Sequence, residues 1–238
     1  YVPELKKEHN IDVVVVNGEN IAGGRGISRK TLDEIYRAGA DIVTSGNHIW
    51  DQKEIVSFID DEPFLIRPAN YPEGAPGKGY CIYPFKAKNI GVINVSGRTF
   101  MPPMDCPFQK VDEILKEIKN QCDIILVDIH AEATSEKIAM GFYLDGKVTC
   151  VVGTHTHVQT ADNRILPKGT AYISDLGMVG PYNSSLGINV NNAIDKFITC
   201  RPVRFEMAEG PNIFSAVVLE LAEDNSVKSF ERILFNEE

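Results

Sequence analysis

The sequence has no long apolar run, no excess of positive charge and no paired cysteine motif. A helix that crosses a membrane needs about 18 or more consecutive apolar residues. The first residues, 1–7, also lack the basic, apolar and small-residue stages of a signal peptide. We therefore expect neither a membrane protein nor a secreted one.

Negative charge exceeds positive charge, with 33 Asp and Glu residues against 24 Lys and Arg residues and a net charge of -9. This balance disfavours binding to nucleic-acid polymers or to anionic membrane surfaces, so an anionic small-molecule substrate would need locally bound cations. The five cysteines are odd in number, widely spaced and without a C-x-x-C pair. They indicate neither a disulfide framework nor a cysteine zinc site, and a reducing cytoplasm is the predicted location.

Short apolar runs alternate with helical patterns along the chain, which predicts an α/β protein. A helix capped by Ser28 follows the first of these runs. The predicted strands are 12–16, 41–44, 90–95, 123–129, 148–152, 172–174, 214–221 and 227–234, of which the last two form an antiparallel pair. Further predicted helices are 51–59, 111–118 and 131–140, and the segment 63–79, rich in Pro and Gly, is an irregular connection.

Polar residues gather where the predicted strands end. Four of the five histidines lie in such exits, and carboxylate and amide side chains accompany them. Open α/β sheets place their ligands at the carboxyl ends of strands. Imidazole nitrogens mixed with carboxylate and amide oxygens suit zinc, manganese or iron. The candidate ligands are Glu19, Asn20, Asn47, His48, His130, His155 and His157.

Each of these residues also has a structural reading. His155 and His157 would point the same way on an extended loop and could face a metal pair together, but H-x-H also occurs on an ordinary strand face. His130 alone fits a hydrogen-bonded histidine at a strand end, and Glu19 and Asn20 fit a turn or a helix cap. Their joint occurrence at four strand exits favours a metal site.

Several blocks of the sequence resemble known enzymes. Gly-Asn-His at 46–48, His130, and Gly-Thr-His-Thr-His at 153–157 resemble, in order and type, the motifs of calcineurin-like metallophosphoesterases. A closer resemblance, to the bacterial YmdB family of cyclic-nucleotide phosphodiesterases, rests on residues 17–20, 46–51, 130–137 and 153–162. It covers essentially the whole chain and implies one domain, 1–238, with a four-layer α-β-β-α sandwich of two mixed sheets.

The resemblance also implies a site. Two metal ions, iron or manganese before zinc or magnesium, would share the bridging carboxylate of Glu19. His48 would stand outside the metal shell and donate a proton to the leaving group. The substrate would be a small cyclic nucleotide, of the 2′,3′-cyclic AMP class before 3′,5′-cyclic AMP, and a homo-oligomer is left open. Implied for the first metal are Asn20 and His157, and for the second Asn47, His130 and His155.

The chain departs from the family pattern at its start. Family members begin with a strand and an Asp-x-x-Gly loop whose aspartate is a further ligand of the first metal, whereas this sequence starts, at Tyr1, inside the helix that follows. Either the sequence is a fragment or the protein lacks the first strand and its loop. In both cases we expect the second metal to bind more tightly than the first and turnover to be weakened.

Two other functions are compatible with the same residues. A regulatory or scaffold protein would keep the site and signal by binding metal and nucleotide with little turnover. A metallo-amidohydrolase also uses H-x-H, but that class places the pair early in the chain, and here it is late. Asp128 and Glu132 flank His130 and are candidate acceptors that orient it, although a solvated or capping role is equally open.

Overall fold

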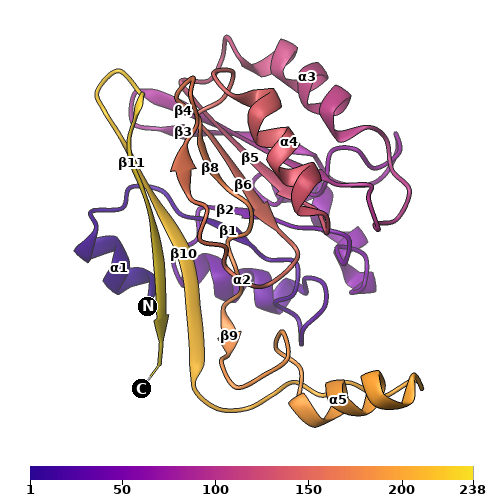
Figure 1. The fold of residues 1–238 in the computed structure, drawn as a ribbon. Helices are drawn as coiled ribbons and strands as arrows, with labels where there is room; N and C mark the ends of the chain where they lie inside the picture. The colour runs from indigo at the N-terminus through magenta and orange to yellow at the C-terminus, as the bar shows by residue number, and fades with distance from the viewer. Residues whose placement is uncertain (238) are drawn as a thin grey trace.

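The computed structural model describes residues 1–237, and its elements follow the predicted alternation of strands and helices (Figure 1). The helices are α1 (Val2–Glu8), α2 (Arg29–Arg37), α3 (Pro107–Ile118), α4 (Thr134–Leu144) and α5 (Val190–Thr199). The strands are β1 (Val15–Asn17), β2 (Ile42–Thr44), β3 (Tyr80–Phe85), β4 (Lys88–Ser96), β5 (Ile124–His130), β6 (Cys150–Thr154), β7 (Arg164–Ile165), β8 (Ala171–Ile173), β9 (Gly180–Pro181), β10 (Asn212–Leu221) and β11 (Val227–Asn236).

A six-stranded sheet in the order β3-β4-β5-β6-β8-β7 forms the centre of the molecule. Strands β4, β5, β6 and β8 run parallel, and β3 and β7 are antiparallel edges. Helices α3 and α4 cover one face, where Val111 and Met140 join Ile93 and Val127 in one buried cluster (Figure 1). The parallel strands are apolar runs because both faces of this sheet are covered.

The other face of the six-stranded sheet is covered by a second β layer. Ile42 of β2 packs with Val92, and Phe230 of β11 packs with Ile173. Helix α2 lies outside this layer, with Leu32 in the same cluster as Val43 of β2. The predicted α-β-β-α sandwich is therefore confirmed. The second layer is divided into a parallel pair, β1-β2, and an antiparallel sheet, β9-β10-β11.

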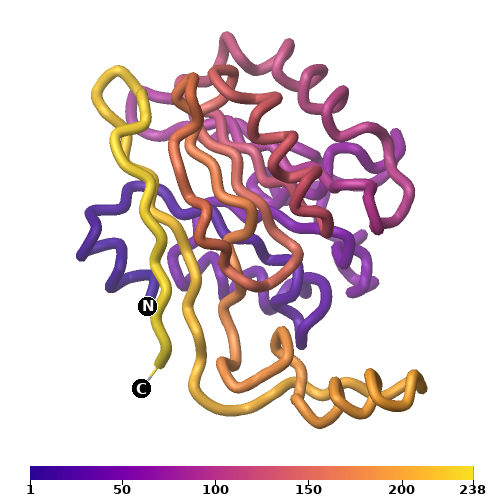
Figure 2. Tube along the Cα trace, in the orientation of Figure 1, coloured from indigo at the N-terminus to yellow at the C-terminus, as the bar shows by residue number. Residues whose placement is uncertain are grey.

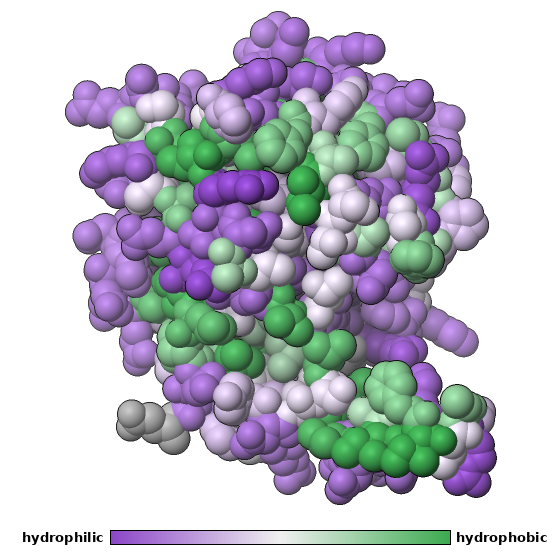
Figure 3. All heavy atoms as spheres, viewed as in Figure 1, coloured by the Kyte–Doolittle hydropathy of each residue, from purple (hydrophilic) through white to green (hydrophobic). Residues whose placement is uncertain are grey.

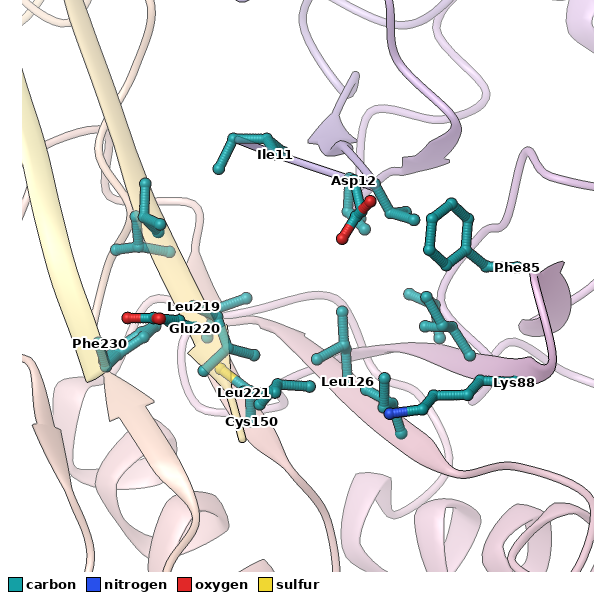
Figure 4. Close-up of a pocket in the computed structure, with 18 of the residues that line it drawn as sticks. Ile11, Asp12, Phe85, Lys88, Leu126, Cys150, Leu219, Glu220, Leu221 and Phe230 are labelled. Carbon is teal, nitrogen blue, oxygen red and sulfur yellow. The ribbon is translucent and has the colours of Figure 1, made fainter. Parts of the chain in front are cut away.

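A cavity of about 680 Å³ lies between the two parts of the second layer and is lined by residues of both β1 and β10 (Figure 4). Its wall is mainly aliphatic and includes Leu126 from the six-stranded sheet, Leu219 from β10 and Phe230 from β11. No histidine of the predicted metal site lines it among residues 1–237. The cavity and the candidate metal site are therefore different places, although both border on the buried Asp128.

The predicted helix at 51–59 is wrong. The chain forms two short 3₁₀ segments there, Lys53–Ser57 and Ile59–Asp61. Ile55 and Ile59 are buried as expected, but a spacing of three to four residues suits one turn of either helix type. Pro63 follows closely and disfavours continued α-helix in the residue before it.

The two termini lie side by side, as Figure 2 shows. The Tyr1 hydroxyl donates to Glu237 Oε1 at 3.1 Å, and the Tyr1 ring packs edge-on against Phe214 and Phe235. The start of α1 is thus attached to the β10-β11 hairpin.

Helix α5, which the sequence analysis did not predict, projects from the body of the molecule (Figure 1). Phe197 and Ile198 of this helix are 79% and 76% exposed. Figure 3 shows apolar surface over α5. Ala193 is the buried residue of this helix. Burial of apolar side chains therefore contributes little to the stability of α5. Within residues 1–237 no helix has both the length and the apolar character that a bilayer crossing requires.

Candidate metal centre

Four strands end at one place and deliver the predicted ligands. Parallel pairing aligns Asn17 of β1 with Thr44 of β2 and His130 of β5 with Thr154 of β6, so the residues after each strand emerge at the same edge. The Asn17 amide donates to Asp128 Oδ2 at 3.1 Å and joins the two β layers next to the site. Residues far apart in the sequence therefore meet because the register of the strands brings their ends together.

His130 Nε2 lies at the centre of the cluster. It is 3.0 Å from Glu19 Oε1, 2.9 Å from Asn47 Oδ1 and 3.0 Å from His155 Nδ1. His130 is fully buried and Glu19 is 1% exposed. Glu19, His130 and His155 each offer a ligand atom, and these atoms all lie within 4.8 Å of one another, which is close enough to hold one metal ion.

Asn20 and His157 form a neighbouring group. Asn20 Nδ2 is 3.3 Å from His157 Nε2 and 3.5 Å from Glu19 Oε2. Glu19 therefore faces both groups, with one carboxylate oxygen toward His130 and the other toward Asn20. The structure thus brings together the six ligands that the family resemblance implies, in two adjacent sets that share one carboxylate.

The hydrogen bonds around His130 indicate that a cation fits here. Thr154 donates its only hydroxyl proton to Asp128 Oδ1 at 2.7 Å, so its oxygen accepts from His130 Nδ1 at 3.0 Å. In a neutral imidazole this arrangement places the proton on Nδ1 and leaves a lone pair on His130 Nε2, which faces the Glu19 carboxylate and the Asn47 carbonyl oxygen. Lone pairs directed at one another repel unless a positive charge lies between them. Even with a proton on Nε2, one donor could satisfy only one of its three neighbours.

Gly46 makes this close packing feasible. A Cβ at this position would lie 2.5 Å from Glu19 Oε1 and nearer still to the His130 ring. The φ of Gly46 is outside the left-handed region, so the requirement for glycine is steric rather than conformational.

The pKa values of the cluster favour forms that can bind a metal. Burial alone would raise the pKa of Glu19, but the His130 imidazole and the backbone N–H of His48 favour the carboxylate, and the pKa falls to about 2. Burial, followed by the neighbouring His130, lowers the pKa of His155 to about 4. Burial also lowers the pKa of His157. Near neutral pH Glu19 is therefore an ionised carboxylate and His155 and His157 are neutral imidazoles, which are the protonation states of metal ligands.

The loop that carries His155 and His157 is a turn, so the extended conformation considered from the sequence is wrong. His155 has a φ of 100° and His157 a φ of 66°, both in the left-handed region that side chains seldom adopt. The two rings consequently point to different partners, His155 toward His130 and His157 toward Asn20. Backbone strain of this kind concentrates at functional sites.

His48 lies beside the cluster. Its backbone N–H donates to Glu19 Oε1 at 3.0 Å, while its ring Nδ1 is 2.9 Å from Asp51 Oδ2. Its side chain is 28% exposed. The sequence analysis did not single out Asp51, although a carboxylate three residues after a histidine is a visible signal for a partner.

Of the two acceptors suggested for His130, neither contacts its ring directly. Asp128 acts through Thr154, and Glu132 Oε2 is 3.2 Å from His155 Nε2 instead. Burial raises the pKa of Asp128, and the hydrogen bonds from Thr44 and Thr154 oppose that shift. Thr154 was not recognised from the sequence because its role depends on the register that pairs it with His130.

Comparisons with known proteins show which family the chain is similar to. The family model described as "YmdB-like protein" matches residues 1–233. A Bacillus subtilis protein named 2′,3′-cyclic-nucleotide 2′-phosphodiesterase is 52% identical over 240 residues, which cover 100% of this chain and 90% of that protein. A crystal structure of a hypothetical protein from Thermus thermophilus has a TM-score of 0.94 at 40% identity and covers 100% of this chain and 92% of that one. A Mycoplasma pneumoniae structure described as a novel phosphatase has a TM-score of 0.93 at 35% identity, covering 99% and 86%.

Proposed function

The chain belongs to the YmdB-like family, and from this premise we propose that it is a metal-dependent phosphodiesterase that hydrolyses a small cyclic nucleotide. The name of the Bacillus subtilis relative makes 2′,3′-cyclic AMP the first substrate to test, with 3′,5′-cyclic AMP next. The observation that carries the proposal is the convergence of a carboxylate, an amide oxygen and a second imidazole on His130 Nε2, at 2.9 to 3.0 Å.

We propose one metal ion for each of the two ligand sets. Glu19 would bridge them, because its two oxygens face different groups. The donors are imidazole nitrogens with carboxylate and amide oxygens, a mixture that suits iron or manganese and also accommodates zinc or magnesium. When bound, such ions bind phosphoryl oxygens and lower the pKa of water. The first metal would take Asn20 and His157, and the second Asn47, His130 and His155.

The protein's own residues orient the metal-binding histidines and transfer the proton. Asp128 and Thr154 fix the tautomer of His130, and the left-handed turn aims His155 and His157 at different partners. As a general acid, His48 carries a proton on both ring nitrogens: Nδ1 donates to Asp51, which orients the ring, and Nε2 holds the proton that a departing ribose oxygen needs. We assign His48 the role of general acid.

Hydrolysis assays with a matched histidine variant test the proposal. Chelator-treated protein reloaded with Mn²⁺ is expected to hydrolyse 2′,3′-cyclic AMP. His48→Ala should lower kcat by about 10²- to 10⁴-fold, the usual contribution of general acid catalysis, without loss of bound metal. His9→Ala is the control, because His9 is exposed at the end of α1.

Other outcomes would contradict the proposal. If the parent protein binds Mn²⁺ and the nucleotide but shows no turnover, the regulatory or scaffold function replaces catalysis. Equal kcat values for His48→Ala and His9→Ala would remove His48 from the mechanism.

A further inference from the structure

A lysine is buried next to the metal-binding turn. Lys137 belongs to the first turns of α4 and is fully inaccessible to solvent. Its ammonium donates to Asp175 Oδ2 at 2.7 Å, and the Asp175 side chain is 2% exposed. Lysine is almost never fully buried unless it is paired, and a buried pair is weak evidence for stability by itself. Stability alone therefore does not explain why this ion pair is buried here.

Asp175 connects the lysine to the turn. Its Oδ2 also accepts from the backbone N–H of Thr156 at 3.0 Å and from the Thr156 hydroxyl at 2.7 Å. Thr156 is the residue between His155 and His157, whose φ values are both in the left-handed region. One carboxylate oxygen thus accepts three hydrogen bonds, two of them from the centre of the strained turn.

The surroundings hold the pair in place. The other Asp175 oxygen accepts from the backbone N–H of Gly177 at 2.8 Å. A Cβ on Gly153 would lie 2.8 Å from Lys137 Cδ, so the lysine stem packs directly on the backbone at the end of β6. Helix α4, strand β6 and the segment after β8 therefore meet at this ion pair, and the turn extends from that junction.

We propose that Lys137 and Asp175 are positioning residues: their buried ion pair holds Thr156, and through it the His155–His157 turn, in the conformation that directs the two imidazoles to their separate metal sites. Lys137 balances the charge of Asp175 in a place without water, and Asp175 opposes relaxation of the turn. The proposal rests on the proposed function in that it takes His155 and His157 as metal ligands. It goes beyond that function because neither Lys137 nor Asp175 touches metal or substrate.

The chain offers a matched control for Asp175. Asp145 is also a buried carboxylate that accepts backbone N–H groups of a loop, those of Lys168 and Thr170, but it lies at the opposite end of α4. Asp175→Asn and Asp145→Asn are therefore the same chemical change in similar surroundings, near to and far from the turn. Thr156→Val removes one hydrogen bond at lower risk to folding, and Thr156→Ser restores the hydroxyl.

The first measurement is Mn²⁺ affinity by calorimetry on chelator-treated protein, with the thermal midpoint of each metal-free variant measured alongside. Loss of a residue that orients ligands usually weakens metal affinity by about 10- to 100-fold. We expect this loss for Asp175→Asn, Lys137→Met and Thr156→Val, recovery to within about twofold for Thr156→Ser, and no loss for Asp145→Asn even where its midpoint falls. Unchanged affinity in Asp175→Asn or Thr156→Val, with only a lower midpoint, would overturn the proposal.

The second measurement does not need metal. Imidazole NMR signals of His155 and His157 in the metal-free protein should shift or broaden in Asp175→Asn and keep their positions in Asp145→Asn, with His9 as the internal reference. Unchanged signals in Asp175→Asn would refute the positioning role. If the parent protein binds no Mn²⁺, the proposed function fails. The NMR comparison of Asp175→Asn with Asp145→Asn still decides whether the ion pair fixes the conformation of the turn.

Discussion

Gly46→Ala adds one methyl group at the most crowded point of the site. The new Cβ would lie 2.5 Å from Glu19 Oε1 and closer to the His130 ring, nearer than real Cβ atoms approach other atoms. His130 cannot easily retreat, because Thr154 and Asp128 hold its other nitrogen. The backbone itself accepts alanine here, since φ is outside the left-handed region. The substitution therefore acts by displacing Glu19 and His130.

The expected magnitude follows from overpacking. Forcing an extra methyl group into a packed site costs about 1 to 3 kcal/mol. For a chain of this size that corresponds to a fall in the thermal midpoint of roughly 2 to 12 °C. Because His130 and Glu19 are the displaced groups, Mn²⁺ affinity should fall by at least about tenfold as well.

The assays are differential scanning fluorimetry and Mn²⁺ calorimetry, with Gly180→Ala as the control. A Cβ on Gly180 meets no atom within 4 Å, and its φ is also outside the left-handed region. We expect Gly180→Ala to behave as the parent protein. A Gly46→Ala protein that binds Mn²⁺ with parental affinity would refute the geometry described for the site.

Three further outcomes are expected. In metal-free protein the free energy of unfolding should decrease as pH falls from 6.5 toward 4, because burial lowers the pKa of His155 to about 4. It should decrease again as pH falls from 4.5 toward 2, because the pKa of Glu19 is about 2 in the folded protein. Urea titrations at several pH values would show both steps, and His155→Ala should flatten the upper one. Chelation should lower the thermal midpoint and Mn²⁺ should restore it, since ligand at a hundredfold excess over Kd raises the free energy of unfolding by about 2.7 kcal/mol; no change on chelation would contradict a metal site. Maleimide should modify the exposed Cys200 far faster than Cys81, whose pKa burial raises to about 12, and equal rates in a mass-spectrometric time course would contradict the buried assignment.

The buried strands were predictable because their residues must be apolar on both faces. Strand β5 is the clearest case, with a continuous apolar run that ends at His130. The edge strand β3 was missed because it contains Pro84 and alternates less clearly. Helix α5 was also missed, although Val190, Ala193, Ile194 and Phe197 have helical spacing.

The ligands could be named from the sequence, but their arrangement could not. Residue types at strand exits and the family resemblance identified the candidates. The left-handed conformations of His155 and His157 depend on tertiary hydrogen bonds, among them those between Asp175 and Thr156. The link from Asp128 through Thr154 depends on strand register. Both are set by residues distant in sequence, which spacing alone does not reveal.

The central claim is that these side chains form a metal centre rather than a hydrogen-bonded polar cluster. An anomalous diffraction experiment on crystals soaked in Mn²⁺ tests it directly. The account predicts a peak bonded to His130 Nε2 and His155 Nδ1, with Glu19 as a further ligand. A map without a peak at these three side chains, in crystals that have taken up Mn²⁺ elsewhere, would contradict it.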